Sequence, residues 1–216
     1  MPVTFPAARP GLFLTFEGPD GAGKTTQIAR LEAALAAHGH AVTRTREPGG
    51  DAVGERVRDL LLHAGPGDVG AGAELLLFAA ARAQNVASVV RPALAAGRVV
   101  LCDRFTDSTL AYQGAGRGLP GDVIGTLNAF ATDGLVPDRT FLLDLPPALG
   151  LARQRAGEQN RLDRENLAFH ERVRAAFLAI AAREPGRVVV LDATRTPDAV
   201  FADLLATVTD LLLRRP

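Results

Sequence analysis

One short glycine-rich segment constrains the fold of this chain more than any other feature. Residues 18–25 read GPDGAGKT and fit the pattern G-x-x-x-x-G-K-[ST] at every defined position. The segment follows the apolar run 12–16 and precedes an amphipathic stretch over about residues 24–37. A strand that turns through such a loop directly into a helix is typical of an α/β fold. We therefore expect ligands to bind in the crevice beyond the carboxyl end of that strand.

Phosphate binding is the chemistry that this segment favours. Its glycines let backbone N–H groups turn inward around an anion, and the start of the following helix adds partial positive charge. The side chain of Lys24 can reach the β- and γ-phosphates of a nucleoside triphosphate, and the hydroxyl of Thr25 can hold Mg²⁺. The predicted cradle comprises Gly18, Pro19, Asp20, Gly21, Ala22, Gly23, Lys24, Thr25 and Thr26.

Lysine usage supports this interpretation. Of the 24 basic residues, 23 are arginine and only Lys24 is lysine. A chain that otherwise uses arginine is expected to keep lysine where a compact charge on a flexible stem is needed. The alternative, a glycine-rich turn with an accidental lysine, does not account for the flanking strand and helix.

Composition sets the remaining bounds. The chain has 216 residues, 47% of them hydrophobic, which is enough for the core of one domain, predicted over 11–216. Residues 1–10 are rich in proline and alanine and are predicted to form a flexible tail. Its 24 basic and 24 acidic residues cancel, which argues against a nucleic-acid binder. Because it shows no 18-residue apolar run and no signal-peptide start, we expect no membrane contact and a cytoplasmic location. A single cysteine, Cys102, excludes an intrachain disulfide.

Apolar runs and helical patterns alternate along the rest of the chain. Further strands are predicted from Ala41 and over about 99–102, 140–144 and 188–191, and further helices over about 52–62, 71–96, 108–115, 121–132, 147–182 and 197–213. Continuously apolar strands separated by helices predict an α/β fold, a P-loop NTPase-type five-stranded parallel sheet with helices on both faces.

Charged residues follow the predicted strands, where phosphoryl transfer would need them. Asp103 ends the third strand and is a candidate Mg²⁺ ligand, although such an aspartate can also be a cap or an ion-pair partner. Positive charge for the transition state could come from arginines on the acceptor side and in a lid at about 153–164. Each could instead be a surface group. The candidates are Arg46, Arg58 and Arg104 on the acceptor side and Arg153, Arg155 and Arg161 in the lid.

Two aromatic residues are candidates for binding a nucleoside. Phe78 and Arg82 are four residues apart and share a helix face, so a ring could stack on a base while the arginine binds its edge. The alternative is a core phenylalanine beside a surface arginine. Tyr112, the only tyrosine, could pack or contact a sugar.

Taken together, these residues resemble the thymidylate kinase family over 12–213. The matching segments follow one another in order and spacing: FEGPDGAGKTTQ from Phe16, TREPGG from Thr45, FAAAR from Phe78, and DRF from Asp103 leading to DSTLAYQG from Asp107. The resemblance implies an enzyme that moves the γ-phosphate of ATP to dTMP, giving dTDP and ADP, with Mg²⁺. It also implies a homodimer, for which the helical stretches 71–96 and 121–132 could supply an interface.

The resemblance also assigns roles to residues of the acceptor site. By this likeness Asp20 faces the sugar 3′-hydroxyl, Arg104 clamps the acceptor phosphate beside Asp103, and Tyr112 crowds the sugar 2′ position. Phe78 stacks on thymine and Arg82 donates to its carbonyl. The remaining members line the site or read the pyrimidine edge: Arg46, Glu47, Pro48, Arg58, Thr109 and Gln113. Residues 192–194 resemble the loop beside adenine.

The lid departs from the family pattern. Gly21 stands where some members carry a P-loop arginine, so the lid must supply the charge, as in the bacterial type. The usual run Asp-Arg-x-Glu is replaced by NRLD over residues 160–163. This register nominates Arg161, and a register through Asp163 nominates Arg164 instead.

Two other functions are alternatives. Another small P-loop kinase, for instance one that phosphorylates a deoxynucleoside hydroxyl, would need a general base and resembles a Glu-Arg-Ser run where this chain has DRF. A GTP-dependent switch would read guanine with Asn-Lys-x-Asp, which the single lysine at position 24 excludes.

Overall fold

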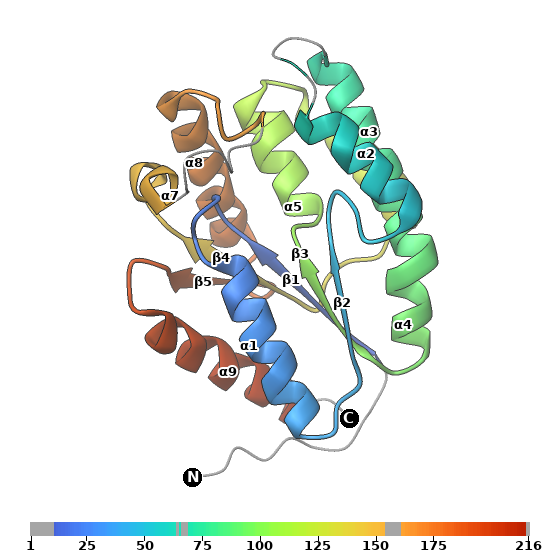
Figure 1. The fold of residues 1–216 in the computed structure, drawn as a ribbon, viewed down its shortest axis with the longest axis vertical. Coiled ribbons are helices and arrows are strands. Elements are labelled where there is room, and N and C mark those ends of the chain that lie inside the picture. The colour runs from blue at the N-terminus through green and yellow to red at the C-terminus, as the bar shows by residue number, and fades with distance from the viewer. Residues whose placement is uncertain (1–10, 64, 66–68, 154–160, 215–216) are drawn as a thin grey trace.

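The computed structural model describes residues 11–63, 65, 69–153 and 161–214. Its five strands form one sheet in the order β2-β3-β1-β4-β5, and every neighbouring pair is parallel (Figure 1). The strands are β1 (Leu12–Glu17), β2 (Val42–Arg46), β3 (Val99–Asp103), β4 (Arg139–Asp144) and β5 (Val188–Asp192). The predicted five-stranded parallel sheet is confirmed, and the strand order, which the sequence pattern left open, comes from the structure.

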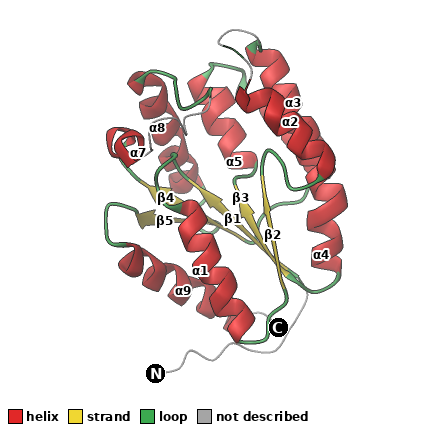
Figure 2. Ribbon diagram, in the orientation of Figure 1, coloured by secondary structure: helices red, strands yellow, loops and turns green. Residues whose placement is uncertain are grey.

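Helices cover both faces of this sheet (Figure 2). Leu12, Leu14 and Phe16 of β1 pack with α1 (Lys24–Ala37) and α9 (Pro197–Arg214) on one face. Phe13, which points the other way, packs with η1 (Val86–Val90) and α4 (Arg91–Ala95). The remaining helices are α2 (Ala52–His63), α3 (Ala71–Asn85), α5 (Thr106–Thr109), α6 (Gly121–Thr132), α7 (Pro147–Arg153) and α8 (Leu167–Arg183).

Two predicted helices change their winding along their length. The stretch expected over 71–96 runs as α3, the π-helical turn η1, and α4. The stretch expected over 108–115 begins two residues earlier as α5 and continues as a second π-helical segment, η2 (Leu110–Gly116). π-Helical turns often occur at functional sites, and η2 carries Tyr112 and Gln113. The predicted tail and residues 154–160 of the lid lie outside the described residues.

By length and composition, the described helical stretch Ala71–Ala95 could cross a membrane. The core helix of a soluble protein passes the same test. This stretch packs against α2 and α6 and buries three polar side chains, those of Glu74, Arg82 and Asn85. Buried polar side chains of this kind need partners within the protein, and the site described below supplies them.

The carboxyl ends of the strands bring distant loops together. The loop after β1 passes so close to its neighbours that side chains are excluded at two positions. A Cβ on Gly18 (φ 128°) would lie 2.3 Å from the backbone oxygen of Leu143 at the end of β4. A Cβ on Gly21 (φ 78°) would lie 2.3 Å from the backbone oxygen of Gly150 in α7. These glycines therefore let the loop pack on β4 and α7.

Candidate active site

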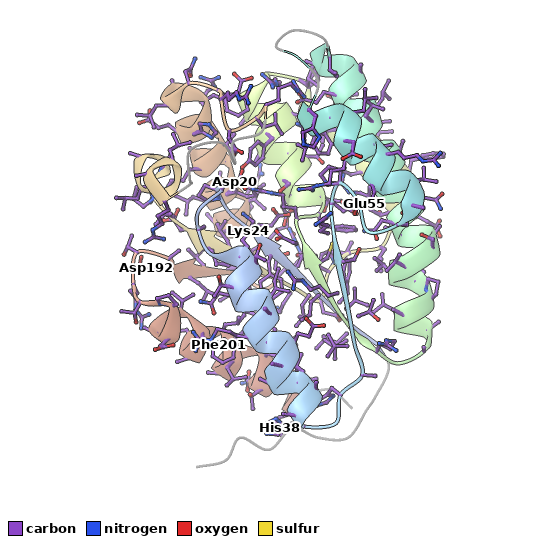
Figure 3. All side chains as sticks on the ribbon, viewed as in Figure 1. Asp20, Lys24, His38, Glu55, Asp192 and Phe201 are labelled. Atoms are coloured by element: carbon purple, nitrogen blue, oxygen red, sulfur yellow. The ribbon has the colours of Figure 1, made fainter. Side chains whose placement is uncertain are left out.

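The glycine-rich loop holds Lys24 at the start of α1, beside Asp20 (Figure 3). The Lys24 ammonium donates to the backbone oxygens of Gly18 (3.1 Å) and Pro19 (3.0 Å), and its Nζ lies 3.7 Å from Oδ1 of Asp20. Burial, followed by the positive charge of Arg104, lowers the pKa of Lys24. The ammonium thus closes the loop and faces the same space as the loop glycines.

A cavity next to this loop gathers most of the predicted charged residues. We call it the loop cavity; it is lined by Asp20, Gly21, Gly23, Lys24, Thr25, Arg46, Glu47, Arg58, Asp103, Arg104 and Arg153. Within it, the Thr25 hydroxyl donates to Oδ2 of Asp103 over 3.3 Å. Strand pairing explains this meeting, because β1 and β3 are neighbours and their carboxyl ends share one edge.

A second cavity adjoins the first and has a more apolar lining. This inner cavity is lined by Asp20, Glu47, Pro48, Arg58, Leu62, Phe78, Arg82, Arg104, Ser108, Thr109, Tyr112, Gln113 and Leu162. Ten of these were predicted site residues, and the structure brings them together from five separate segments. Sequence reasoning missed Leu62, Ser108 and Leu162. Of these, only Ser108 carried a signal, because it belongs to the segment from Asp107 that resembles the family.

Arg104 stands where the two cavities meet. Its Nη2 donates to Oδ1 of Asp20 (2.8 Å) and to the hydroxyl of Tyr112 (3.2 Å), and its Nη1 donates to Oγ of Ser108 (3.1 Å). Burial opposes its charge, but Asp20, Tyr112, Glu17 and Asp103 together outweigh this effect, and the pKa of Arg104 is raised. Burial would raise the pKa of Asp20, yet Arg104 and Lys24 lower it below its usual range. Both groups are therefore charged at neutral pH.

The backbone of Arg104 is unusual. Its φ of 70° lies in the left-handed region, and among described non-glycine residues only Asp133, after α6, shares this feature. A side chain at such a φ costs about 1–3 kcal/mol and persists only where surrounding contacts hold it.

Arg82 is locked into the wall of the inner cavity. Its side chain donates to Glu47 (2.7 Å), Thr109 (2.9 Å), Asn128 (2.6 Å) and the backbone oxygen of Phe105 (3.0 Å). It is 1% exposed, so the alternative of a surface arginine is wrong. Four of its five N–H groups are used by the protein, which leaves one to reach a ligand.

The lid arginines occupy different places. Arg153, at the end of α7, donates to the backbone oxygens of Ala193 (3.2 Å) and Gly21 (3.4 Å) and lines the loop cavity. Arg161 instead turns to buried Glu74 and to the backbone oxygen of Leu61 (3.0 Å), and it lines neither cavity. The third candidate, Arg155, lies outside the described residues. Arg164, the alternative register, lies in the turn before α8.

An outer cavity continues from the loop past α1. It is lined by Gly21, Ala22, Gly23, Thr26, Gln27, Arg153, Ala193, Arg195, Pro197 and Val200. Residues 192–194, which resemble the loop beside adenine, begin with an aspartate that accepts from the backbone N–H (2.9 Å) and hydroxyl (2.6 Å) of Thr194. The three cavities thus form a path from α9, across the loop, to Phe78.

A P-loop with its lysine, a hydroxyl–carboxylate pair beside it, and arginines between two adjoining cavities are the features of a P-loop kinase. Comparison with known proteins gives the family. The family model described as thymidylate kinase matches residues 16–204. The chain therefore belongs to the thymidylate kinase family, whose members are ATP-dependent phosphotransferases.

Individual relatives agree over nearly the whole chain. A thymidylate kinase of Deinococcus radiodurans is 55% identical over 201 residues, covering 93% of this chain and 97% of the relative. One from Desulfovibrio desulfuricans is 51% identical over 214 residues, covering 94% and 98%. The crystal structure of thymidylate kinase from Ehrlichia chaffeensis aligns with a TM-score of 0.76 at 34% identity, covering 93% of this chain and 99% of that one.

Proposed function

We propose that this enzyme transfers the γ-phosphate of ATP to dTMP, giving dTDP and ADP. The observation that carries the proposal is the junction of the loop and inner cavities, which share Asp20, Glu47, Arg58 and Arg104. A nucleotide whose base lies by Phe78 would present its phosphate to Arg104, next to the γ-phosphate of a triphosphate in the loop. This arrangement suits a phosphate acceptor.

In the proposed donor site, residues 18–26 hold the triphosphate and Lys24 reaches its terminal phosphates. The hydroxyl of Thr25 and the carboxylate of Asp103 are oxygen donors 3.3 Å apart on the wall of the loop cavity, which suits Mg²⁺. When bound there, Mg²⁺ would neutralise charge on the β- and γ-phosphates. The outer cavity, bordered by Ala193, is the proposed place of adenine.

In the proposed acceptor site, Phe78 stacks on thymine and the remaining N–H of Arg82 donates to a thymine carbonyl. Thr109 and Gln113 border the same space and are placed to read the pyrimidine edge. Tyr112 lies under Arg104, whose guanidinium is 5.0 Å from its ring centre, where it would crowd a ribose 2′-hydroxyl. Asp20 faces the sugar 3′-hydroxyl.

The transfer itself needs positioning more than proton removal, because a phosphate oxygen is already nucleophilic. An oxygen of the dTMP phosphate attacks the γ-phosphorus in line, and the bond to the β-phosphate oxygen breaks to release ADP. Lys24, Arg104 and Arg153 neutralise the charge that spreads over the transferred group. Among the described lid arginines, only Arg153 lines the loop cavity, which supports its choice over Arg161 for this role.

A homodimer is proposed to form through α3 and α6. These helices pack against each other and expose Leu76 (58%), Val123 (46%) and Phe130 (84%). Exposed apolar side chains on adjacent helices are typical of a self-association surface. If the homodimer forms in this way, light scattering of Phe130→Asp should give half the mass of the wild type.

We further propose that the protein acts in the cytoplasm as one domain.

A steady-state assay tests the proposed function. ADP release is measured with ATP, Mg²⁺ and each nucleoside monophosphate in turn, with thymidine as the acceptor of the rival deoxynucleoside kinase. We expect dTMP to be the best acceptor and thymidine to give no turnover. Phosphorylation of thymidine at a rate above that of dTMP would overturn the proposal.

A further inference from the structure

Glu17 is a buried carboxylate for which the proposed mechanism has no use. It is the last residue of β1, directly before the glycine-rich loop, and is 1% exposed. Its Oε1 accepts from the backbone N–H groups of Phe105 (2.8 Å) and Ser108 (3.2 Å), and its Oε2 accepts from the Ser108 hydroxyl (2.5 Å). The carboxylate thereby caps the first turn of α5, in which the Ser108 N–H also donates to the backbone oxygen of Phe105 (3.1 Å).

These three bonds all fall next to Arg104. Phe105, whose N–H binds Glu17, follows Arg104 directly, so the bond holds the chain just after the left-handed φ of 70°. The backbone N–H of Arg104 itself donates to Phe16, the residue before Glu17 (2.9 Å). Two consecutive residues at the end of β1, Phe16 and Glu17, therefore accept hydrogen bonds from the N–H groups of Arg104 and Phe105.

The Ser108 hydroxyl carries the same constraint to the guanidinium. A hydroxyl has one proton and two lone pairs. Ser108 gives its proton to Glu17, so a lone pair is left to accept from Nη1 of Arg104 at 3.1 Å. A neutral amide in place of the carboxylate could donate to Ser108 instead of accepting from it. The hydroxyl proton would then lose the acceptor that fixes its direction, and a lone pair would no longer be held toward Arg104.

We propose that Glu17 is a positioning residue for phosphoryl transfer, which sets the orientation of the Arg104 guanidinium through Ser108 and the backbone of Phe105. The inference rests on the proposed function, in which Arg104 binds the dTMP phosphate. It assigns Glu17 to the acceptor side of the reaction, although its neighbours in sequence belong to the donor loop.

The surroundings of Glu17 show that its charge is held at a cost. Burial, and then the charge of Asp107, raise the pKa of Glu17 to about 7, while Arg104 and the bonds from Ser108 and Phe105 oppose this rise. A neutral side chain of similar size could fill the same space without the cost of burying a charge. Packing alone therefore does not explain a carboxylate at this position.

The test compares acceptor and donor kinetics at about pH 8.5, where a carboxyl with a pKa of about 7 is ionised. Losing a charge-assisted hydrogen bond corresponds to roughly tenfold, so Glu17→Gln and Ser108→Ala should each raise the KM for dTMP by about that factor. The KM for ATP should change by less than about twofold in both. The double variant should be no worse than the poorer single one, because both act through one hydroxyl.

Two controls separate positioning from stability. Asp107→Asn removes another buried carboxylate of α5, which pairs with Arg187 at 2.7 and 3.0 Å, and should lower the melting temperature without changing the KM for dTMP. Glu17→Asp keeps the charge and should restore part of the dTMP affinity. Ser108→Ala remains informative if Glu17→Gln does not fold.

The outcomes distinguish this inference from the function on which it rests. If Arg104→Ala leaves the KM for dTMP unchanged, the proposed acceptor site is wrong. If Arg104→Ala raises that KM while Glu17→Gln and Ser108→Ala do not, only the positioning role of Glu17 is wrong. Additive losses in the double variant, or equal losses for ATP and dTMP, would also overturn it.

Discussion

The loop cavity takes much of its lining from one continuous segment, whereas the inner cavity collects side chains in ones and twos from α2, α3, α5, η2 and the turn before α8. Arg104 and Arg82 show the same contrast. Arg104 has a left-handed φ and stands at the junction of the two cavities. Arg82 donates four hydrogen bonds to the protein in the wall of the inner cavity. A phosphate can be held by the backbone N–H groups of one loop and a few cationic side chains, but a base needs walls whose shape is set by tertiary packing.

The largest effect is expected from the donor side of this comparison. Lys24→Ala should lower kcat by about 10³-fold, because the transferred phosphate loses a preorganised charge. The melting temperature should not fall, since Lys24 is buried at a cost that lowers its pKa. Turnover assays and thermal melts check both points, and near-normal turnover would contradict the proposed mechanism.

A strong but selective effect is expected from the wall of the inner cavity. Arg82→Ala leaves buried Glu47 without its 2.7 Å partner, which typically costs about 3–5 kcal/mol of folding free energy. The KM for dTMP should rise about 10²-fold while the KM for ATP stays nearly constant. Arg91→Ala is the matched control, because Arg91 pairs with Asp133 at the surface. Equal losses for ATP and dTMP would show that the base does not bind beside Arg82.

The two described lid arginines should separate function from anchoring. Arg153→Ala should lower kcat by about 10²-fold with little loss of stability, because its partners are two backbone oxygens. Arg161→Ala should lower the melting temperature instead, because Glu74, which is fully buried, loses one of its partners. Single-turnover rates and melts of both variants test this. The reverse pattern would make Arg161 the arginine that contacts the transferred group.

The smallest effect concerns the acceptor base. We expect dUMP to be a poorer acceptor than dTMP, but only by about 1–3 kcal/mol in kcat/KM, because a single methyl group in an apolar pocket discriminates weakly. Competition between the two nucleotides in one assay measures the ratio directly. A ratio above about 10³ would require a polar contact that reads the methyl-bearing edge.

Several of these residues could be identified from the sequence because their signals are local. The spacing of residues 18–25 predicted the cradle, and apolar runs predicted the five strands. Leu62, Leu162 and Glu17 could not be found in this way. Two are ordinary apolar residues, and the third gains its meaning only when β1 lies beside β3 and the start of α5 folds over its end.

The sequence by itself therefore determined the phosphate loop, the parallel α/β fold and the family, since each depends on short-range spacing and periodicity. The tertiary structure alone decided the strand order and the contact of Arg161 with buried Glu74. It also decided the hydrogen bonds that hold Arg82 and those that Glu17 accepts from Phe105 and Ser108. The physical reason is the separation along the chain of the residues that interact. Glycine torsions and helix starts are set by neighbouring residues. Hydrogen bonds between residues 35 to 91 positions apart exist only after the sheet and its helices have packed.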